Sequence, residues 1–507
     1  MEKPLLFCHR DGSAEVAGMI QIIYSDVAPG ADNDATYSGQ TQSYALLDNL
    51  SAGASPCLIA TGEPGRWKLD GSVDILGYVD ADYGYVSAAQ SNTSGKYAAG
   101  VGLDITLTGS YTSSGLTILF DPFEDVQYAV KVSWYNGDTL LHSAEYTAGG
   151  AELVIERIVT LYNKIKVEFV SSSKPCRYAR IQRVIYGVEH VFTPADFTAA
   201  SLIQEVNPIS EDLAIDTSSF TLRPQTQMQY MFQSRQPFKI YRDGALTAAH
   251  YLRNADTTTR SNYTVSCQSA IGILADQPFV AKIYTSKTAQ EIATDILGDA
   301  FEWTMQDNLK TVLLSGYIPA GDKRAALHQL LFALGAVCST ADSTAIRIFT
   351  PPQTAKQIPA SNIYTGASIK ANPVVTSVKL AYHAYSTTAA EGSSSVEVDG
   401  VTYYDTVGYV VKNNPNVVSG TPDNPIEITS ATLVTQARAN ALIDGLYAYY
   451  VYNSEVTQKI IVTDETPGDR VQTVDILNND FSGIITKRET AITNLFASTL
   501  TIRGQNT

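Results

Sequence analysis

Histidines and acidic residues are the side chains in this sequence that could carry acid–base or metal chemistry. No two of the six histidines have the spacing that places zinc ligands on one face of a helix. His328 stands among apolar residues of a predicted helix, so we expect a structural role for it. Nucleophile-elbow, phosphate-loop and dinucleotide motifs are absent from the sequence. The sequence therefore predicts no catalytic residue, no metal centre and no cofactor.

Two acidic clusters could supply the paired carboxylates that glycoside hydrolysis requires. They are Asp121/Glu124/Asp125 and Asp464/Glu465/Asp469. We interpret both as solvated turns rather than as catalytic pairs. The first cluster lies between predicted strands, so a calcium ion held by loop oxygens is the alternative there.

Tyrosines are unusually frequent, with 30 in 507 residues, and several lie near predicted turns. Exposed aromatic rings can stack on the C–H faces of sugars, so five of them are candidate carbohydrate contacts. These are Tyr83, Tyr85, Tyr97, Tyr111 and Tyr135. The alternative, which we favour for most of them, is that the rings pack on the face of a sheet.

Composition excludes several classes of protein. With 35 basic and 51 acidic residues the net charge is −16, which opposes the phosphate contacts of a nucleic-acid-binding protein. The five cysteines are odd in number and lack a Cys-x-x-Cys pair, so we expect buried free thiols rather than disulfides or a zinc site. The N-terminus, with Asp11 and Glu15, does not resemble a signal peptide. The longest apolar run, 330–338, is too short to span a bilayer.

Period-two alternation of apolar and polar residues dominates the chain and predicts half-buried antiparallel strands. In 128–134, the residues at even positions are apolar or aromatic and face one side; in 164–169, Ile165, Val167 and Phe169 do the same. Turn residues such as Asn136-Gly137-Asp138 separate these runs, as in a β-sandwich. The sequence contains no internal repeat that we can detect.

Three helices interrupt the strands. The first, about 288–298, opens with the capping box formed by Thr288 and Glu291. The second, about 323–334, follows Asp322 and ends at Gly335. The third is expected over about 430–448. Its expected buried face consists of Val434, Ala437, Ala441, Leu442 and Leu446.

Several short motifs, taken in order, resemble the tail-tip or baseplate hub family of phages and related injection machines. The phrase at 63–71, the segment 206–210 followed by 220–222, and the strand–turn–helix stretch 316–327 resemble successive parts of that hub. Near the end, 466–469 and 482–485 resemble its last β-domain, where a turn and a hairpin close the fold. The stretch 316–327 is the most specific, and the shared order of the motifs carries the resemblance.

Residues 82–187 interrupt this order and resemble a galactose-binding-like (discoidin-type) jelly roll. The expected fold is mainly β, with α+β hub domains, tube-like β-barrel domains and an inserted β-sandwich. The expected domains are 1–80 (hub, first part), 81–188 (insert), 189–284 (tube-like barrel), 285–385 (α+β hub), 386–428 (long hairpin or loop) and 429–507 (helix and tube-like β-domain).

The resemblance implies a non-enzymatic virion protein that assembles as a homotrimer at the tail tip. Two tube-like domains in each subunit, around 219–280 and at the C-terminus, would match a hexameric tail tube. Expected partners are the tube or distal tail protein above, a tip, fibre or tape-measure protein below, and a host-surface glycan bound by the insert. No nucleic-acid binding and no membrane span are expected. The alternative is a glycan-degrading tail enzyme with a carbohydrate-binding module.

Overall fold

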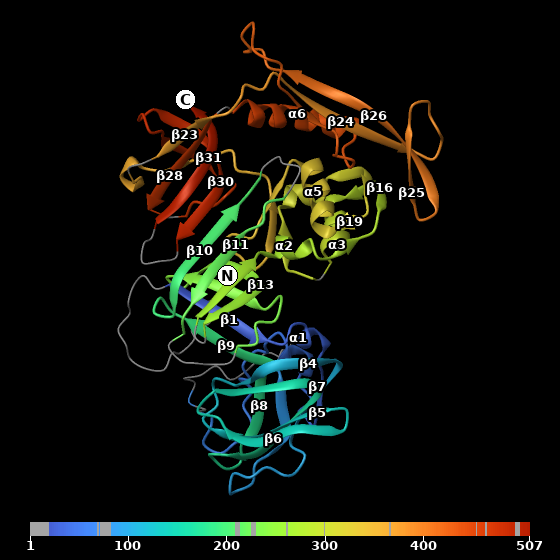
Figure 1. Cartoon of the computed structure of the whole chain (residues 1–507). Helices are drawn as coiled ribbons and strands as arrows, with labels where there is room; N and C mark the ends of the chain where they lie inside the picture. The colour runs from blue at the N-terminus through green and yellow to red at the C-terminus, as the bar shows by residue number, and fades with distance from the viewer. Residues whose placement is uncertain are drawn as a thin grey trace. The chain divides into compact units, whose positions relative to one another are not determined.

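The computed structural model describes residues 20–67, 70, 83–207, 213–224, 230–259, 262–298, 300–364, 367–452, 454–461, 464–491 and 497–506 (Figure 1). Cys8, the expected domain boundary near residue 80 and residues 208–210 lie outside these ranges. The chain divides into two compact units. The first unit is Met1–Ile22, Phe192–Gln225 and Lys239–Thr507, and the second unit is Ile23–Val191 and Thr226–Phe238.

Strands make up most of both units, so the predicted mainly β architecture is confirmed. Most strand pairs are antiparallel, as the alternating sequence pattern requires. Among the described residues, no helix is long and apolar enough to cross a membrane. Four cysteines are described, all as free thiols: Cys57, Cys267 and Cys338 are buried, and Cys176 is partly exposed.

The second unit is built on a seven-stranded sheet with the order β3-β8-β4-β7-β5-β6, in which β2 pairs with β4. Its strands are β2 (Thr36–Gly39), β3 (Tyr85–Gln90), β4 (Gly102–Phe120), β5 (Tyr128–Asn136), β6 (Thr139–Thr147), β7 (Glu152–Ser172) and β8 (Tyr178–Ile185). A short helix, α1 (Ala31–Asp34), precedes β2. The unit thus takes in residues on both sides of the segment 81–188.

The alternation predicted for β5 and β7 is confirmed. Tyr128, Val130, Val132 and Trp134 are all fully buried. In the antiparallel register Val132 lies opposite Val167 and Trp134 opposite Ile165. Cross-strand apolar pairs of this kind stabilise a sheet face, and they form the core of the second unit.

The first unit contains most of a long sheet, with the order β23-β28-β31-β30-β10-β11-β14-β13-β12. Its strands are β10 (Phe197–Glu205), β11 (Thr217–Leu222), β12 (Pro237–Arg242), β13 (Ala245–Thr259), β14 (Asn262–Gln268), β23 (Ser368–Ala371), β28 (Ser454–Ile461), β30 (Asp480–Ala491) and β31 (Ala497–Asn506). β29 (Arg470–Val474) pairs with β30 and with β22 (Lys356–Gln357). The division between the units falls within β1 (Ile20–Val27), β9 (Gly187–Phe192) and β12. In the sheet order, β1 lies between β12 and β9.

A helical core lies in the middle of the first unit (Figure 1). Its helices are α2 (Ala270–Leu274), α3 (Ala289–Leu297), α4 (Asp307–Lys310) and α5 (Lys323–Leu334). Short strands surround them: β15 (Pro278–Phe279), β16 (Lys282–Thr288), β17 (Trp303–Met305), β18 (Leu313–Ile318), β19 (Gly321–Asp322), β20 (Val337–Ser339) and β21 (Ile346–Phe349). The capping box of α3 is confirmed, as are the Asp322 cap and Gly335 end of α5. β18, the turn and α5 also give 316–327 the expected strand–turn–helix form.

The third helix differs from the prediction. α6 spans Gln436–Val451 rather than starting near Ser430. The carbonyls of Thr432 and Val434 accept hydrogen bonds from the backbone N–H groups of Tyr317 and His383, which holds this segment outside the helix. The predicted face was also wrong in part, because Ala437 and Ala441 are exposed. The buried positions are Ala439, Ile443, Leu446 and Tyr449.

α6 packs on a four-stranded sheet with the order β25-β26-β24-β27. Its strands are β24 (Ser377–Ser386), β25 (Ser394–Val398), β26 (Val401–Asn413) and β27 (Pro425–Ile428). β25 and β26 form a long hairpin within the range 386–428. In Figure 1 this sheet is drawn in orange beside α6.

Candidate functional site

The acidic cluster at 121–125 is not the solvated turn that its sequence suggested. Asp121 is 1% exposed, and its carboxylate accepts hydrogen bonds from the backbone N–H groups of Cys57 and Phe123 at 2.8 and 2.9 Å. Asp125 binds Arg177 Nε at 2.9 Å, and this hydrogen bond lowers the pKa of Asp125. These carboxylates are occupied by protein donors, and in the described part of the chain no group of metal-ligating residues gathers.

Glu63, Arg66, Glu124 and Arg180 form a buried arginine–carboxylate cluster. Arg180 Nη2 lies 2.6 Å from Glu63 Oε2, and its Nη1 lies 2.9 Å from Glu124 Oε1. Arg66 Nη1 approaches the same two carboxylates at 3.3 and 3.0 Å. All four side chains are at most 3% exposed. Two positive and two negative charges therefore balance inside the second unit.

The two carboxylates of the cluster respond differently to their surroundings. Burial alone would raise the pKa of Glu63, but the hydrogen bond and charge of Arg180 lower it overall. Burial raises the pKa of Glu124. The cluster fixes the motif at 63–67 against β8, because Glu63 also accepts the backbone N–H of Tyr178 at 2.8 Å. Arg180 lies 117 residues from Glu63 and 56 residues from Glu124, which is why the sequence did not reveal the cluster.

The five candidate tyrosines do not share one surface. Tyr83 and Tyr85 are buried, and the Tyr85 ring stacks on Phe169 with ring centroids 6.0 Å apart. Tyr97 is partly exposed and packs edge-on against Phe169 at 5.6 Å. The remaining two are also partly exposed: Tyr111 donates to Asp34 at 3.0 Å, and Lys164 Nζ lies 5.9 Å from the ring centroid of Tyr135. Sugar binding stays a prediction for this set.

Other chemistry-bearing residues in the first unit are engaged in packing. His328 is buried in α5, as expected for a structural histidine. His383 Nδ1 lies 2.8 Å from Asp405 Oδ2, and both are almost fully buried. In the second acidic cluster, Asp464 and Asp469 both bind Lys356, at 3.2 and 2.9 Å, whereas Glu465 is buried.

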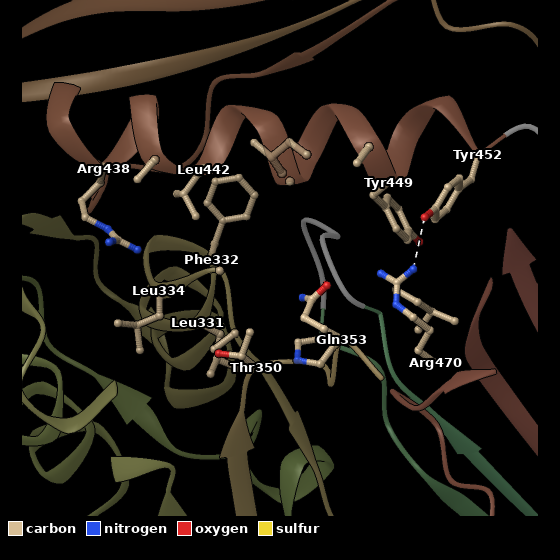
Figure 2. A pocket seen from close by; sticks show the side chains of 18 residues that line it. Leu331, Phe332, Leu334, Thr350, Gln353, Arg438, Leu442, Tyr449, Tyr452 and Arg470 are labelled. Carbon is tan, nitrogen blue, oxygen red and sulfur yellow. Dashed lines mark hydrogen bonds between the residues drawn. The ribbon is translucent and has the colours of Figure 1, made fainter. Parts of the chain in front are cut away.

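A cavity of about 440 Å³ lies between α6, the C-terminal end of α5 and the segment after β21 (Figure 2). Its side chains are mainly apolar, and Figure 2 shows Arg438 and Arg470 toward its two ends. Arg438 Nε donates to the carbonyl of Ala333 at 2.9 Å, and Arg470 Nη1 donates to the Tyr452 hydroxyl at 3.4 Å. The described residues that line the cavity include no Asp, Glu, His or Cys. These lining residues therefore supply no carboxylate pair of the kind that glycoside hydrolysis requires.

Two sets of four antiparallel strands in the first unit share one topology. We call β11–β14 the first repeat and β28–β31 the second repeat. Each has the spatial order second–third–fourth–first, which gives β12-β13-β14-β11 and β29-β30-β31-β28. A further antiparallel strand flanks the first strand of each repeat: β10 beside β11, and β23 beside β28.

The registers of the two repeats also correspond. The long third strand of each repeat is bulged, directly after Leu252 in β13 and directly after Ile485 in β30. Leu252 lies opposite Cys267, and Ile485 lies opposite Ile502. One residue further across the sheet, Ser218 lies opposite Cys267 and Val456 lies opposite Ile502. Counted from the bulges, Ser218 and Val456 are therefore equivalent, and both are buried.

The repeats join edge to edge through β10 and the part of β30 that follows its bulge. In this antiparallel junction Leu202 lies opposite Thr490 and Glu205 lies opposite Lys487. Leu202 is fully buried, and Lys487 Nζ lies 3.3 Å from Glu205 Oε1. The junction thus combines backbone pairing, a buried leucine and a cross-strand ion pair.

No family model matches the chain, and no curated protein matches it. Similar solved structures are those of a tail protein from Neisseria meningitidis MC58 (12% identity, TM-score 0.45, 62% of this chain and 93% of that chain), the prophage tail protein gp18 from Listeria monocytogenes EGD-e (14%, 0.43, 63% and 92%) and the 43 kDa tail protein of prophage MuSo2 from Shewanella oneidensis (10%, 0.43, 62% and 95%). All three are described as tail proteins, and the second and third as proteins of prophages. At TM-scores below 0.5, they do not establish membership of a family.

Proposed function

We propose that the chain is a structural subunit of a phage-type tail, and that three copies form a hub which closes the tail tube. The repeated strand topology carries this proposal. Each chain contributes two equivalent repeats in one continuous sheet, so three copies would present six. A sixfold set of similar surfaces is what a hexameric tube requires from a trimeric partner.

The collinear sequence motifs support the same function. The stretch 316–327 forms β18, a turn and α5, and 220–222 lies in β11 of the first repeat. At the other end, Thr466 and Asp469 close a turn through a 2.8 Å hydrogen bond, and 482–485 lies in β30 of the second repeat. The proposed partners are the tube or distal tail protein above the hub and a tip, fibre or tape-measure protein below it.

Imaging of the hub on its tube tests this proposal. The full chain is mixed with tail tubes polymerised from the tube protein of the same virus and examined by electron cryomicroscopy. We expect a threefold cap at one end of the tube, with six copies of the strand repeat facing the tube. Binding along the tube wall, or ends that stay bare at saturating concentration, would contradict the proposed function.

Carbohydrate contact by the second unit is part of the proposal and has its own test. Single sugar sites gain little net energy, so millimolar to micromolar affinity is expected, about −4 to −8 kcal/mol. Tyr111→Ala and Tyr135→Ala should weaken binding to host envelope polysaccharide, because these rings are partly exposed. Tyr85→Phe is the matched control, since Tyr85 is buried and its change leaves the surface unaltered. Equal binding by all variants would remove these tyrosines as contacts.

A further inference from the structure

The first unit pairs its two repeats internally, whereas the equivalent edges, on β23 and on the later part of β13, have no second strand partner among the described residues. β23 is the terminal strand of the sheet among the described residues. β12 is six residues long and joins the 15-residue β13 through the turn Asp243–Gly244, whose two φ angles are positive. Along β13, β12 can therefore reach only the beginning of the strand, and its other neighbour in the sheet is β1. Beyond the bulge, residues 254–257 have a described strand partner on one side only, which is β14.

These two edges are the equivalents of the two strands that meet inside the chain. Counted from the bulges, residues 254–257 of β13 correspond to 487–490 of β30. Leu202 lies opposite Ser218, and Ile369 lies opposite Val456, the equivalent of Ser218. Ile369 of β23 thus corresponds to Leu202 of β10. β23 and β13 are therefore equivalent to β10 and β30, but within the described chain they do not pair with each other.

We propose that β23 of one chain pairs antiparallel with residues 254–257 of β13 in the next copy, and so repeats the β10–β30 junction between subunits. The register follows from the internal junction: Ile369 opposite Thr257, Lys370 opposite Asp256, and Ala371 opposite Ala255. This pairing rests on the proposed function, because it joins the three copies of the hub.

The side chains on the two edges suit this pairing. Ile369 is 41% exposed, whereas its equivalent Leu202, flanked by strands on both sides, is fully buried. A second strand beside β23 would cover Ile369 in the same way. Lys370 and Asp256 are both exposed and would lie opposite each other, which places opposite charges across the strands as Lys487 and Glu205 are placed internally.

A disulfide across the proposed junction tests the register. Neighbouring pairs in an antiparallel ladder alternate between wide and close Cα spacing, so one of two adjacent pairs suits a disulfide. We would oxidise full-length Ile369→Cys/Thr257→Cys and Lys370→Cys/Asp256→Cys, alone and with tail tubes. One of the two double variants should give disulfide-linked dimers and trimers, with no species larger than three chains. The four single-cysteine variants should give no linked dimers or trimers.

Charge reversal provides a second measurement. Lys370→Glu or Asp256→Lys should each raise the concentration for half-assembly by about tenfold, and the double reversal should restore it. Lys131→Glu, an exposed lysine of the second unit, should leave assembly unchanged. A trimer that neither cross-links nor responds to charge reversal would overturn the proposed pairing and leave the hub standing. A chain that stays monomeric at high concentration and with tubes would overturn both.

Discussion

Removal of Arg180 should destabilise the second unit strongly. Its guanidinium is 1% exposed and bonds both Glu63 and Glu124. Arg180→Met keeps much of the volume but leaves two buried carboxylates with Arg66 alone, so the cluster changes from neutral to one net negative charge. Breaking a buried, hydrogen-bonded charge network in this way costs about 3–5 kcal/mol. The exposed pair Lys131–Glu168, at 3.7 Å, offers the control: Lys131→Met should cost less than about 1 kcal/mol.

Urea unfolding followed by tryptophan fluorescence measures this difference. In a Trp303→Phe background the remaining tryptophans, Trp67 and Trp134, both belong to the second unit. Acidification gives a further readout. In the wild type the pKa of Glu63 is lowered from its ordinary value of 4.5. The ionised Glu63 therefore stabilises the fold above pH 4.5, and this stabilisation is lost as the pH falls through the folded-state pKa.

Without Arg180 the sign reverses, because an unpaired buried carboxylate has a raised pKa. The destabilisation should therefore shrink as the pH falls from 7 toward 5. Arg180→Met and Lys131→Met variants of equal stability, or a loss below about 1 kcal/mol for Arg180→Met, would refute this account of the cluster.

Three further substitutions test the packing. Burial raises the pKa of Asp216 to about 6, so between pH 4 and 6.5 the folded state keeps a proton that the unfolded state releases. The stability of the first unit, measured by hydrogen exchange, should therefore fall by on the order of 3 kcal/mol as the pH rises over this range. The Asp216→Asn variant should show no such fall. Gly115→Ala would place a Cβ 1.8 Å from the Ile155 carbonyl oxygen and should cost at least about 3 kcal/mol in the fluorescence assay; a loss below 1 kcal/mol would contradict that packing. Thr288→Ala removes the capping box and should speed exchange in α3 by the equivalent of about 1 kcal/mol, with unchanged protection as the opposing result.

Features fixed by neighbouring residues could be predicted from the sequence. The alternation in β5 and the caps of α3 and α5 depend on residues a few positions apart, and they form as expected. The start of α6 could not be predicted, because the carbonyl of Val434 is held by the backbone of His383 in β24. The burial of Glu124 has the same origin, since its partner Arg180 lies 56 residues away.

The repeat was invisible in the sequence because equivalent positions share burial rather than residue type. Ser218 and Val456 occupy the same place in the two repeats, as do Leu202 and Ile369 in the flanking strands. Strand order and bulge position carry the repeat, and both depend on long-range pairing. The candidate sugar contacts show that nearness to a predicted turn is a poor guide to the exposure of a side chain, since Tyr85 lies in the core.

The native mass of the full-length protein, alone and with its tail tube protein, tests the central claim most directly. Three chains of 54.8 kDa amount to about 164 kDa. We expect native mass spectrometry to give this species at high concentration or on addition of the tube protein. A mass of 54.8 kDa under every condition, or a dimer that does not proceed to three chains, would contradict the proposed hub.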